Sequence, residues 1–178
     1  MRILDDGAPV ISTPRLRLRA PQAEDAPRLA QLANDPGVAR MTTRMPHPYG
    51  LSDAEDFLGR CGRKDAARER VFALEREGEG LIGMLGFHPN EAGRTEMGYW
   101  LGRPYWGQGL ATEAADAALV WASEGWRRRY VMAGHFVDNP ASGNVLCKTG
   151  FLYTGDVVPL HSLARGEPAP TRMMVWLA

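Results

Sequence analysis

The sequence predicts a single domain of mixed α/β class, in which a mostly antiparallel sheet is flanked by about four helices. Three observations support this. Apolar strands joined by short turns follow one another between residues 70 and 101. A strand, a glycine turn and a helix are consecutive between residues 95 and 125, and no linker or repeat divides the chain. At 178 residues the chain would bury roughly 70% of its unfolded surface, so we expect one domain over residues 1–178 with a core from about residue 13 to residue 177.

The chain begins with a lead-in, a strand and a helix. Residues 1–12 show no periodicity and are expected to be irregular. Residues 15–19 alternate arginine and leucine, which is the pattern of a half-buried strand with one wet face. Glu24 and Asp25 then open a helix, and the Asn-Asp-Pro-Gly sequence at residues 34–37 closes it.

A second helix is expected after a loop or short helix over residues 38–49. Ser52 and Glu55 have the spacing of a capping box. This spacing predicts a helix from Asp53 to about Lys64.

Three strands occupy the middle of the chain. Residues 70–75 and 81–88 are apolar, and the Gly-Glu-Gly sequence at 78–80 indicates a hairpin between them. Residues 90–94 form a second turn that leads into the strand at 95–101. An antiparallel meander is the simplest topology for these strands.

A long helix follows the strand at 95–101. Gly102 and Pro104 end the strand. From Leu110, small and apolar residues recur at helical spacing until Gly125 stops the helix. Because this apolar stripe is mostly alanine, the helix can lie close to the sheet.

The turn before this helix has the character of an anion-binding site. Gly107 and Gly109 have no Cβ to hold a ligand away from the backbone, and the helix N-terminus adds free N–H donors and partial positive charge. A phosphate is the natural guest, and a plain tight turn is the alternative. A P-loop is disfavoured because no Gly-Lys-Ser/Thr is present, and a dinucleotide fingerprint because Thr112 replaces its third glycine and Glu124 lies in the helix.

The last third of the chain predicts three strands and one helix. Residues 129–137 form a strand, and Asn139 with Ser142 can cap a helix that runs to Lys148. Residues 151–158 and 173–177 supply the closing strands. Residues 159–171 are rich in Gly and Pro and are expected to be a loop.

Composition excludes several classes of function. Twenty-one basic and 21 acidic residues leave a formal net charge of zero, which argues against a general nucleic-acid or membrane-binding surface. Cys61 and Cys147 lie far apart without a metal-ligand pattern, so neither a disulfide framework nor a metal site is expected. No apolar run approaches the length of a membrane span, and we expect a cytoplasmic protein.

Several motifs resemble the GNAT superfamily of N-acetyltransferases, in its RimJ/RimL-type branch. The resemblance covers nearly the whole chain, from about Thr13 to Leu177. The residues that carry it are Tyr99-Trp100-Leu101, the run from Tyr105 to Ala114, Asn139-Pro140-Ala141-Ser142 and Lys148-Thr149-Gly150-Phe151.

The resemblance implies a site for acetyl-CoA, the cosubstrate of the family. Two neighbouring parallel strands would splay apart, here 95–101 and 129–137, and the pantetheine arm would lie between them. Pro104 departs from the wider superfamily, which often has Gln or Arg at this place in the phosphate turn. The implied contacts are the backbone of Tyr99, Trp100 and Leu101 for pantetheine, the N–H groups of Gly107, Gln108, Gly109, Leu110, Ala111 and Thr112 for the pyrophosphate, and Asn139 and Asn144 for the arm.

Two residues are implied for proton transfer. Glu96 is the carboxylate on the active strand and would act as base through a water, although a wet-face glutamate is the equal alternative. His88, His135 or water alone could replace it. Many family members carry a tyrosine that acts as general acid where this chain has Leu146, so Ser142 is the candidate acid here. A role in capping the helix explains the serine equally well.

The acceptor is expected to be a primary amine, either a protein N-terminal α-amino group or a small molecule. An α-amino group is easier to deprotonate at neutral pH than a lysine, so a single uncertain base suffices for it. Monomer and homodimer both remain open. The competing function is a non-catalytic acyl-CoA-binding or regulatory domain, and a nucleotide-binding α/β protein is a third, less favoured reading.

Overall fold

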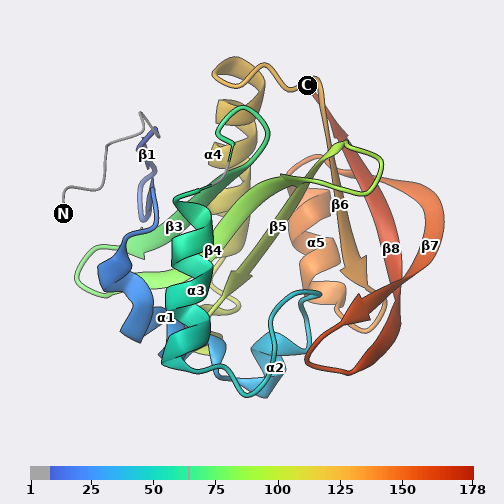
Figure 1. Cartoon of the computed structure of the whole chain (residues 1–178). Coiled ribbons are helices and arrows are strands. Elements are labelled where there is room, and N and C mark those ends of the chain that lie inside the picture. The colour runs from blue at the N-terminus through green and yellow to red at the C-terminus, as the bar shows by residue number, and fades with distance from the viewer. Residues whose placement is uncertain (1–8, 64) are drawn as a thin grey trace.

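One mixed sheet organises the protein. The computed structural model describes residues 9–63 and 65–178, and in this part of the chain eight strands follow the order β1-β2-β3-β4-β5-β6-β8-β7 (Figure 1). All neighbouring strands pair antiparallel except β5 and β6, which are parallel. The expected mixed sheet is therefore confirmed. The strands are β1 (Ile11–Ser12), β2 (Arg17–Arg19), β3 (Arg70–Arg76), β4 (Gly80–Pro89), β5 (Thr95–Leu101), β6 (Tyr130–Phe136), β7 (Leu152–Ser162) and β8 (Glu167–Leu177).

Helices cover both faces of the sheet. Helices α1 and α3 lie on one face, where Leu29 and Ala54 pack with Met84, and α4 and α5 lie on the other, where Ala118 and Leu146 join a larger apolar cluster (Figure 1). Successive side chains of the central strands β3 and β4 point to opposite faces of the sheet, so each strand contributes to both apolar clusters. The α-helices of the described residues are α1 (Ala26–Ala33), α2 (Pro36–Ala39), α3 (Leu51–Cys61), α4 (Leu110–Glu124) and α5 (Pro140–Lys148), with 3-10 turns η1 (Ala23–Asp25) and η2 (Arg103–Tyr105).

The prediction of a loop over residues 159–171 is wrong. β7 runs on to Ser162 and β8 begins at Glu167, so most of this segment is a hairpin. Prolines are tolerated here because β7 is an edge strand, and β8 pairs with β6 only from Thr171 onward, which leaves one edge of its first residues open.

The expected cap of the second helix is also wrong. α3 begins at Leu51, and the carboxylate of Asp53 accepts the backbone N–H of Gly50 at 2.8 Å. Ser52 and Glu55 are exposed on the helix surface. The helix ends at Cys61, and Lys64 lies outside the described residues.

The N-terminal expectation is partly corrected. Ile11 and Ser12 form a short strand that pairs with Leu18 and Arg17, where an irregular lead-in was expected. Residues 1–8 lie outside the described part of the chain. Leu16 and Leu18 are buried between exposed arginines at 15 and 17, which confirms the expected alternation.

The parallel pair opens at the centre of the sheet. Within residues 65–178, the register between β5 and β6 consists of one pair, Glu96 with Met132. Beyond it the strands separate while each keeps its antiparallel neighbour, β4 for β5 and β8 for β6. This opening is where the functional residues gather.

Candidate active site

A cavity of about 990 Å³ occupies the opening between β5 and β6. The glycine turn before α4 lines one end of it, Glu96 and Tyr99 line its middle, and Asn139 and Ser142 at the start of α5 line the side next to β6. Most of the residues that the sequence singles out are thus brought together in one space. A cavity of this volume suits a cofactor-sized ligand with its co-reactant.

The glycine turn has the backbone of an anion cradle. Gly107 and Gly109 adopt φ values of 71° and 76°, a left-handed conformation that favours glycine. A Cβ added at Gly107 would meet nothing within 4 Å, so its open side faces free space. Gly109 is the N-cap of α4, a helix of 15 residues, and the free N–H groups of its first turn therefore begin at this cradle.

Side chains from other segments hold the turn in place. Arg15 donates to the Gln108 carbonyl at 2.8 Å and to Glu113 at 2.6 Å, and the hydroxyl of Thr13 donates to Glu113 at 2.6 Å. Burial opposes ionisation of Glu113, but the hydrogen bonds from Thr13 and Arg15 outweigh it and lower the pKa of this carboxyl. The Gln108 side chain donates to Pro104 at 2.9 Å and does not line the cavity.

Three residues of β5 lie along the cavity as expected. Tyr99, Trp100 and Leu101 all line it, and past Glu96 their strand edge forms no ladder with β6 in the described residues. The carbonyl of Leu101 already accepts the indole N–H of Trp106 at 2.8 Å. Because a carbonyl oxygen has two lone pairs, a ligand arm that pairs with β5 would share this acceptor with Trp106.

The N-terminal half of α5 and its cap residue bring three polar side chains to the cavity, those of Asn139, Ser142 and Asn144. Asn139 caps the helix by accepting the Ser142 backbone N–H at 3.2 Å, and Asn144 is exposed one turn later and lines the same cavity. The Ser142 hydroxyl lies 2.9 Å from the phenol oxygen of Tyr99. Burial raises the pKa of Tyr99 to about 12, with the hydrogen bond to Ser142 acting in the opposite direction, so the phenol stays protonated at neutral pH.

Glu96 has the environment of a tuned carboxylate. It lies at the point where β5 and β6 part, and 22% of its side chain is exposed. Burial raises its pKa, while the charge of Arg44 and a hydrogen bond from Asn90 offset part of the effect. His88, its cross-strand neighbour, places Nε2 at 3.9 Å from Glu96 Oε1. A carboxyl with a raised pKa in a cavity suits acid–base chemistry near neutral pH.

His135 is in a different situation. Its Nδ1 lies 2.9 Å from the Phe136 carbonyl oxygen, which can only accept, so this nitrogen carries the proton. Its Nε2 then accepts the Tyr153 hydroxyl at 3.0 Å. Both ring nitrogens of His135 are thus engaged, and 6% of its surface is exposed, although it also lines the cavity.

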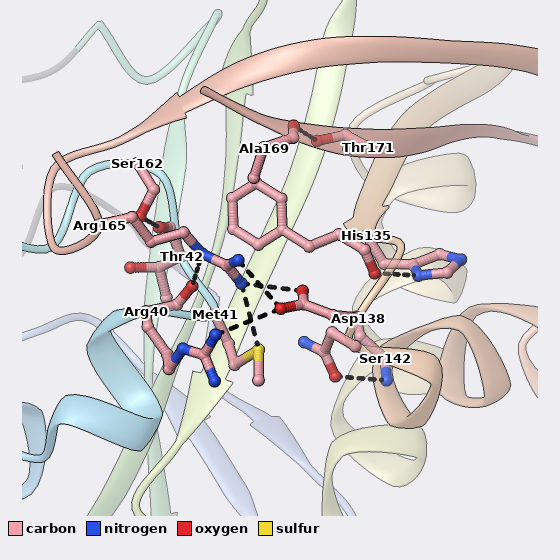
Figure 2. A network of polar contacts seen from close by, with 12 residues as sticks. Arg40, Met41, Thr42, His135, Asp138, Ser142, Ser162, Arg165, Ala169 and Thr171 are labelled. Atoms are coloured by element: carbon pink, nitrogen blue, oxygen red, sulfur yellow. Dashed lines mark hydrogen bonds and ion pairs between the residues drawn. The ribbon is translucent and has the colours of Figure 1, made fainter. Parts of the chain in front are cut away.

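A network of polar contacts supports the part of the cavity lining that Met41 and Thr42 provide (Figure 2). Arg165, after β7, makes two hydrogen bonds of 2.9 Å to Asp138, which follows β6, and one of 2.8 Å to the Arg40 carbonyl after α2. Ser162 donates to the Thr42 carbonyl at 2.9 Å. These contacts join the β7–β8 hairpin tip, the α2–α3 loop and the β6–α5 turn.

Sequence reasoning missed the residues that connect distant segments. Arg15 was expected only as the wet face of a strand, and Asp138 and Arg165 had no assigned role. Their partners lie 93 and 27 residues away, so no local pattern marks them. Asp138 directly before the cap residue Asn139 is the one hint that the sequence offers.

Comparison with known proteins identifies the family. Residues 15–152 match the model of the acetyltransferase (GNAT) domain. The uncharacterized N-acetyltransferase p20 of Bacillus licheniformis is 36% identical over 111 residues, 60% of this chain and 62% of that protein. The ribosomal-protein-serine acetyltransferase of Escherichia coli is 36% identical over 89 residues, 48% of this chain and 49% of that protein. The matched regions thus span less than two thirds of either relative.

The fold points the same way. The structure of Mycobacterium smegmatis RimJ in complex with CoA-disulfide superposes with a TM-score of 0.81 at 18% identity, covering 96% of this chain and 87% of that one. At this identity the likeness concerns the fold. Because the family match covers most of the sequence, the chain belongs to the GNAT family of acetyltransferases, with relatives of the RimJ/RimL type.

Proposed function

We propose that the protein transfers the acetyl group of acetyl-CoA to a primary amine, either a protein N-terminal α-amino group or a small-molecule amine, by direct attack on the thioester. One observation carries the proposal: a single cavity runs from the glycine turn, through the opening between β5 and β6, to Glu96. A related fold has been solved with CoA, and a relative is named for acetylating a ribosomal protein.

The chain offers a fitting site for the cosubstrate. The N–H groups from Gly107 to Thr112 would hold the pyrophosphate on the glycine cradle, with Gln108 contributing through its backbone. The open edge of β5 at Tyr99 to Leu101 would pair with the pantetheine arm, and Asn139 and Asn144 would contact it from α5. Acetyl-CoA would supply an acetyl group activated as a thioester.

Two residues then manage the protons of the reaction. An ammonium acceptor must lose two protons while nitrogen bonds to the carbonyl carbon and the carbon–sulfur bond breaks. Glu96 takes up a proton from the nitrogen through a water and passes it to solvent. The second proton leaves the nitrogen as the carbon–sulfur bond breaks and converts the departing thiolate to a thiol, while Ser142 hydrogen-bonds the sulfur. A backbone N–H of β5 stabilises the oxyanion.

The acceptor class follows from the cost of deprotonation. An α-amino group with a pKa near 7.7–8.0 costs about 1 kcal/mol to deprotonate at neutral pH, whereas a lysine near 10.4 costs roughly 4–5 kcal/mol. A single buried carboxylate is enough for the first.

The described residues contain no helix long and apolar enough to span a membrane. We propose a cytoplasmic enzyme with a protein or small-molecule partner.

Thermal melting with acetyl-CoA, CoA, ATP and NAD tests the cofactor half of the proposal. A ligand at about 100 times its dissociation constant stabilises the fold by about 2.7 kcal/mol. We expect the CoA species alone to raise the melting temperature. No rise with acetyl-CoA, or an equal rise with ATP and NAD, would contradict the assignment.

Release of free thiol from acetyl-CoA in the presence of an amine tests the chemical half. We expect amine-dependent thiol release that Glu96→Gln and Ser142→Ala reduce. The competing function, a non-catalytic acyl-CoA-binding or regulatory domain, predicts tight CoA binding with no amine-dependent release. A lysine peptide acetylated faster than both α-amino peptides and small amines would overturn the proposed acceptor class.

A further inference from the structure

Three pairs of residues on β4 and β5 form the floor of the cavity on the side of α1 and α3. The register places His88 opposite Glu96, Gly86 opposite Gly98 and Met84 opposite Trp100. Residues directly opposite in an antiparallel pair share a face, and every second residue returns to that face. The floor thus has a polar row, a bare row of two glycines and an apolar row, and all six residues line the cavity.

The bare row is not required by the fold. A Cβ added at Gly98 would have His88 Cε1, at 3.9 Å, as its nearest neighbour, which is ordinary contact distance. Neither glycine has the positive φ that would demand its conformational freedom. Glycine inside a strand weakens it by roughly 0.5–1 kcal/mol relative to alanine. What the glycines provide is bare backbone that a ligand can approach closely.

The apolar row is bordered by a preformed apolar wall. Met84 belongs to a buried cluster with Met45, against which Phe57 of α3 and Trp100 pack. The α2–α3 loop that carries Met45 is tied down by the network in Figure 2, through Ser162 to Thr42 and Arg165 to Arg40. Methionine and aromatic side chains adapt to apolar groups of varied shape, and a fixed wall lowers the cost of binding them.

The spacing of the rows sets the size of the group that fits. Two residues along a strand span about 7 Å, so the bare row lies about 7 Å from Glu96 on one side and from Trp100 on the other. An amine placed over the glycines would meet the carboxylate on one side and a side-chain-sized apolar space on the other.

We infer that the acceptor binds with its amine over the Gly86–Gly98 pair and an apolar group against Met84 and Trp100. The substrate class is a primary α-amine next to an apolar side chain: a protein N-terminus with Leu, Met or Phe first, or a small amine with the same substituent. Gly98 is a specificity-determining residue. The inference rests on the proposed acetyl transfer and narrows its acceptor.

A panel of peptides that differ only in the first residue tests this, with the full chain, acetyl-CoA and thiol release as the readout. We expect kcat/KM for Leu, Met and Phe to exceed that for Gly, Ser and Asp by about 10-fold or more, as filling an apolar pocket gives. Leucinamide and glycinamide repeat the comparison without a peptide. If leucinamide exceeds glycinamide but the peptides do not differ, the acceptor is a small molecule. If the peptides differ but the two amides do not, the acceptor is a protein N-terminus.

Gly98→Ala and Gly98→Val test the bare row, because the fold has room for the added carbon. We expect acceptor kcat/KM to fall about 10-fold for alanine and further for valine, while the melting shift with CoA is unchanged. Gly59→Ala is the matched control, since Gly59 on α3 has nothing within 4 Å and does not line the cavity.

The outcomes separate this inference from the function on which it rests. Acetyl transfer with equal rates for apolar and polar first residues, or unchanged acceptor kinetics in Gly98→Val, overturns the inference and leaves the proposed function standing. Transfer to none of the amines overturns both.

Discussion

The two ends of the cavity are built in opposite ways. The proposed cofactor end comes from one continuous stretch, β5, a glycine turn and α4, and would present main-chain groups to its ligand. The proposed acceptor end combines the α2–α3 loop, α3, β4 and the β7–β8 hairpin, and side chains hold these parts together.

We expect this difference to separate recognition of the cosubstrate, which depends on the main chain, from recognition of the amine, which depends on side chains. A main-chain cradle depends on backbone conformation, which Gly107 and Gly109 provide here, so we expect it to bind a phosphate with little dependence on the neighbouring side chains. The acceptor wall depends on contacts such as Arg165 with Asp138, which one substitution can change. Damage at the first end should abolish cosubstrate binding, and damage at the second should alter the choice or affinity of the amine.

Gly109→Trp should have the largest effect. The new side chain would start 3.6 Å from the Arg15 guanidinium that holds the turn, and the left-handed backbone at φ 76° disfavours any residue with a Cβ by roughly 1–2 kcal/mol. We expect the rise in melting temperature with CoA to disappear. Gly78→Trp is the matched control, because Gly78 has φ 77° in the β3–β4 turn, away from the cavity. A full CoA response in Gly109→Trp would contradict the location of the site.

The same contrast explains what the sequence could predict. The strand, turn and helix from Thr95 to Glu124 were predictable because spacing, glycine positions and the helix stop are all local signals. The proposed cofactor end lies in the same stretch, so its residues could be proposed from the sequence, and most of them line the cavity. Gln108 was the exception, since its side chain turns to Pro104 and Arg76, a contact 32 residues away.

The acceptor end could not be predicted in the same way. Pro159, Pro168 and Pro170 gave the segment the composition of a loop, yet they lie on strand edges that need no N–H donor. The start of α3 was misplaced because Asp53 and Ser52 are both plausible capping residues. The burial of Tyr49, whose N–H donates to Asn34 at 3.0 Å, is a tertiary contact that fixes the choice.

Glu96→Gln lies between the two ends and should lower kcat by about 10²–10⁴-fold, the usual contribution of a general base. The sign of its pKa shift adds a second test. A carboxyl whose pKa is raised on folding destabilises the fold where it is ionised, and this cost is relieved as pH falls through the raised pKa. At neutral pH we therefore expect Glu96→Gln to melt at a higher temperature than the wild type while losing activity.

The pH dependence of activity completes this test. Glu96 must be ionised to accept a proton, so wild-type activity should fall on the acid side at a pH above the ordinary value of 4.5. Glu96→Gln should lose this limb. An unchanged profile in the variant would assign proton removal to another group or to water.

Asp138→Asn should have a smaller effect, confined to the acceptor. It removes the charge that binds Arg165 twice at 2.9 Å and Arg40 at 3.3 Å. Losing about 1 kcal/mol of wall stability would raise the acceptor KM about fivefold and leave CoA affinity unchanged. Glu79→Gln, which breaks a pair with Arg76 outside the cavity, is the control and should leave KM unchanged.

The stability of the same variant has a defined pH dependence. Arg165, and to a lesser extent Arg40, lower the pKa of Asp138 against the effect of burial. The contribution is therefore present above the ordinary pKa of an aspartate and is lost as pH falls through the lowered value. Because 46% of this side chain is exposed, its contribution is at most about 1 kcal/mol. Wild type and Asp138→Asn should converge in strongly acidic solution.

Tyr153→Phe should have the smallest effect on activity, and it tests whether His135 serves as base. The variant leaves Nε2 of a buried imidazole without its donor at 3.0 Å, which costs about 1 kcal/mol, or about 2–4 °C of melting temperature. If His135 only joins β6 to β7, kcat and the acid limb of the pH profile will stay as in the wild type. A displaced acid limb would instead mean that the protonation of His135 controls the reaction. In that case the base would be His135 on β6, on the other side of the opening from Glu96 on β5.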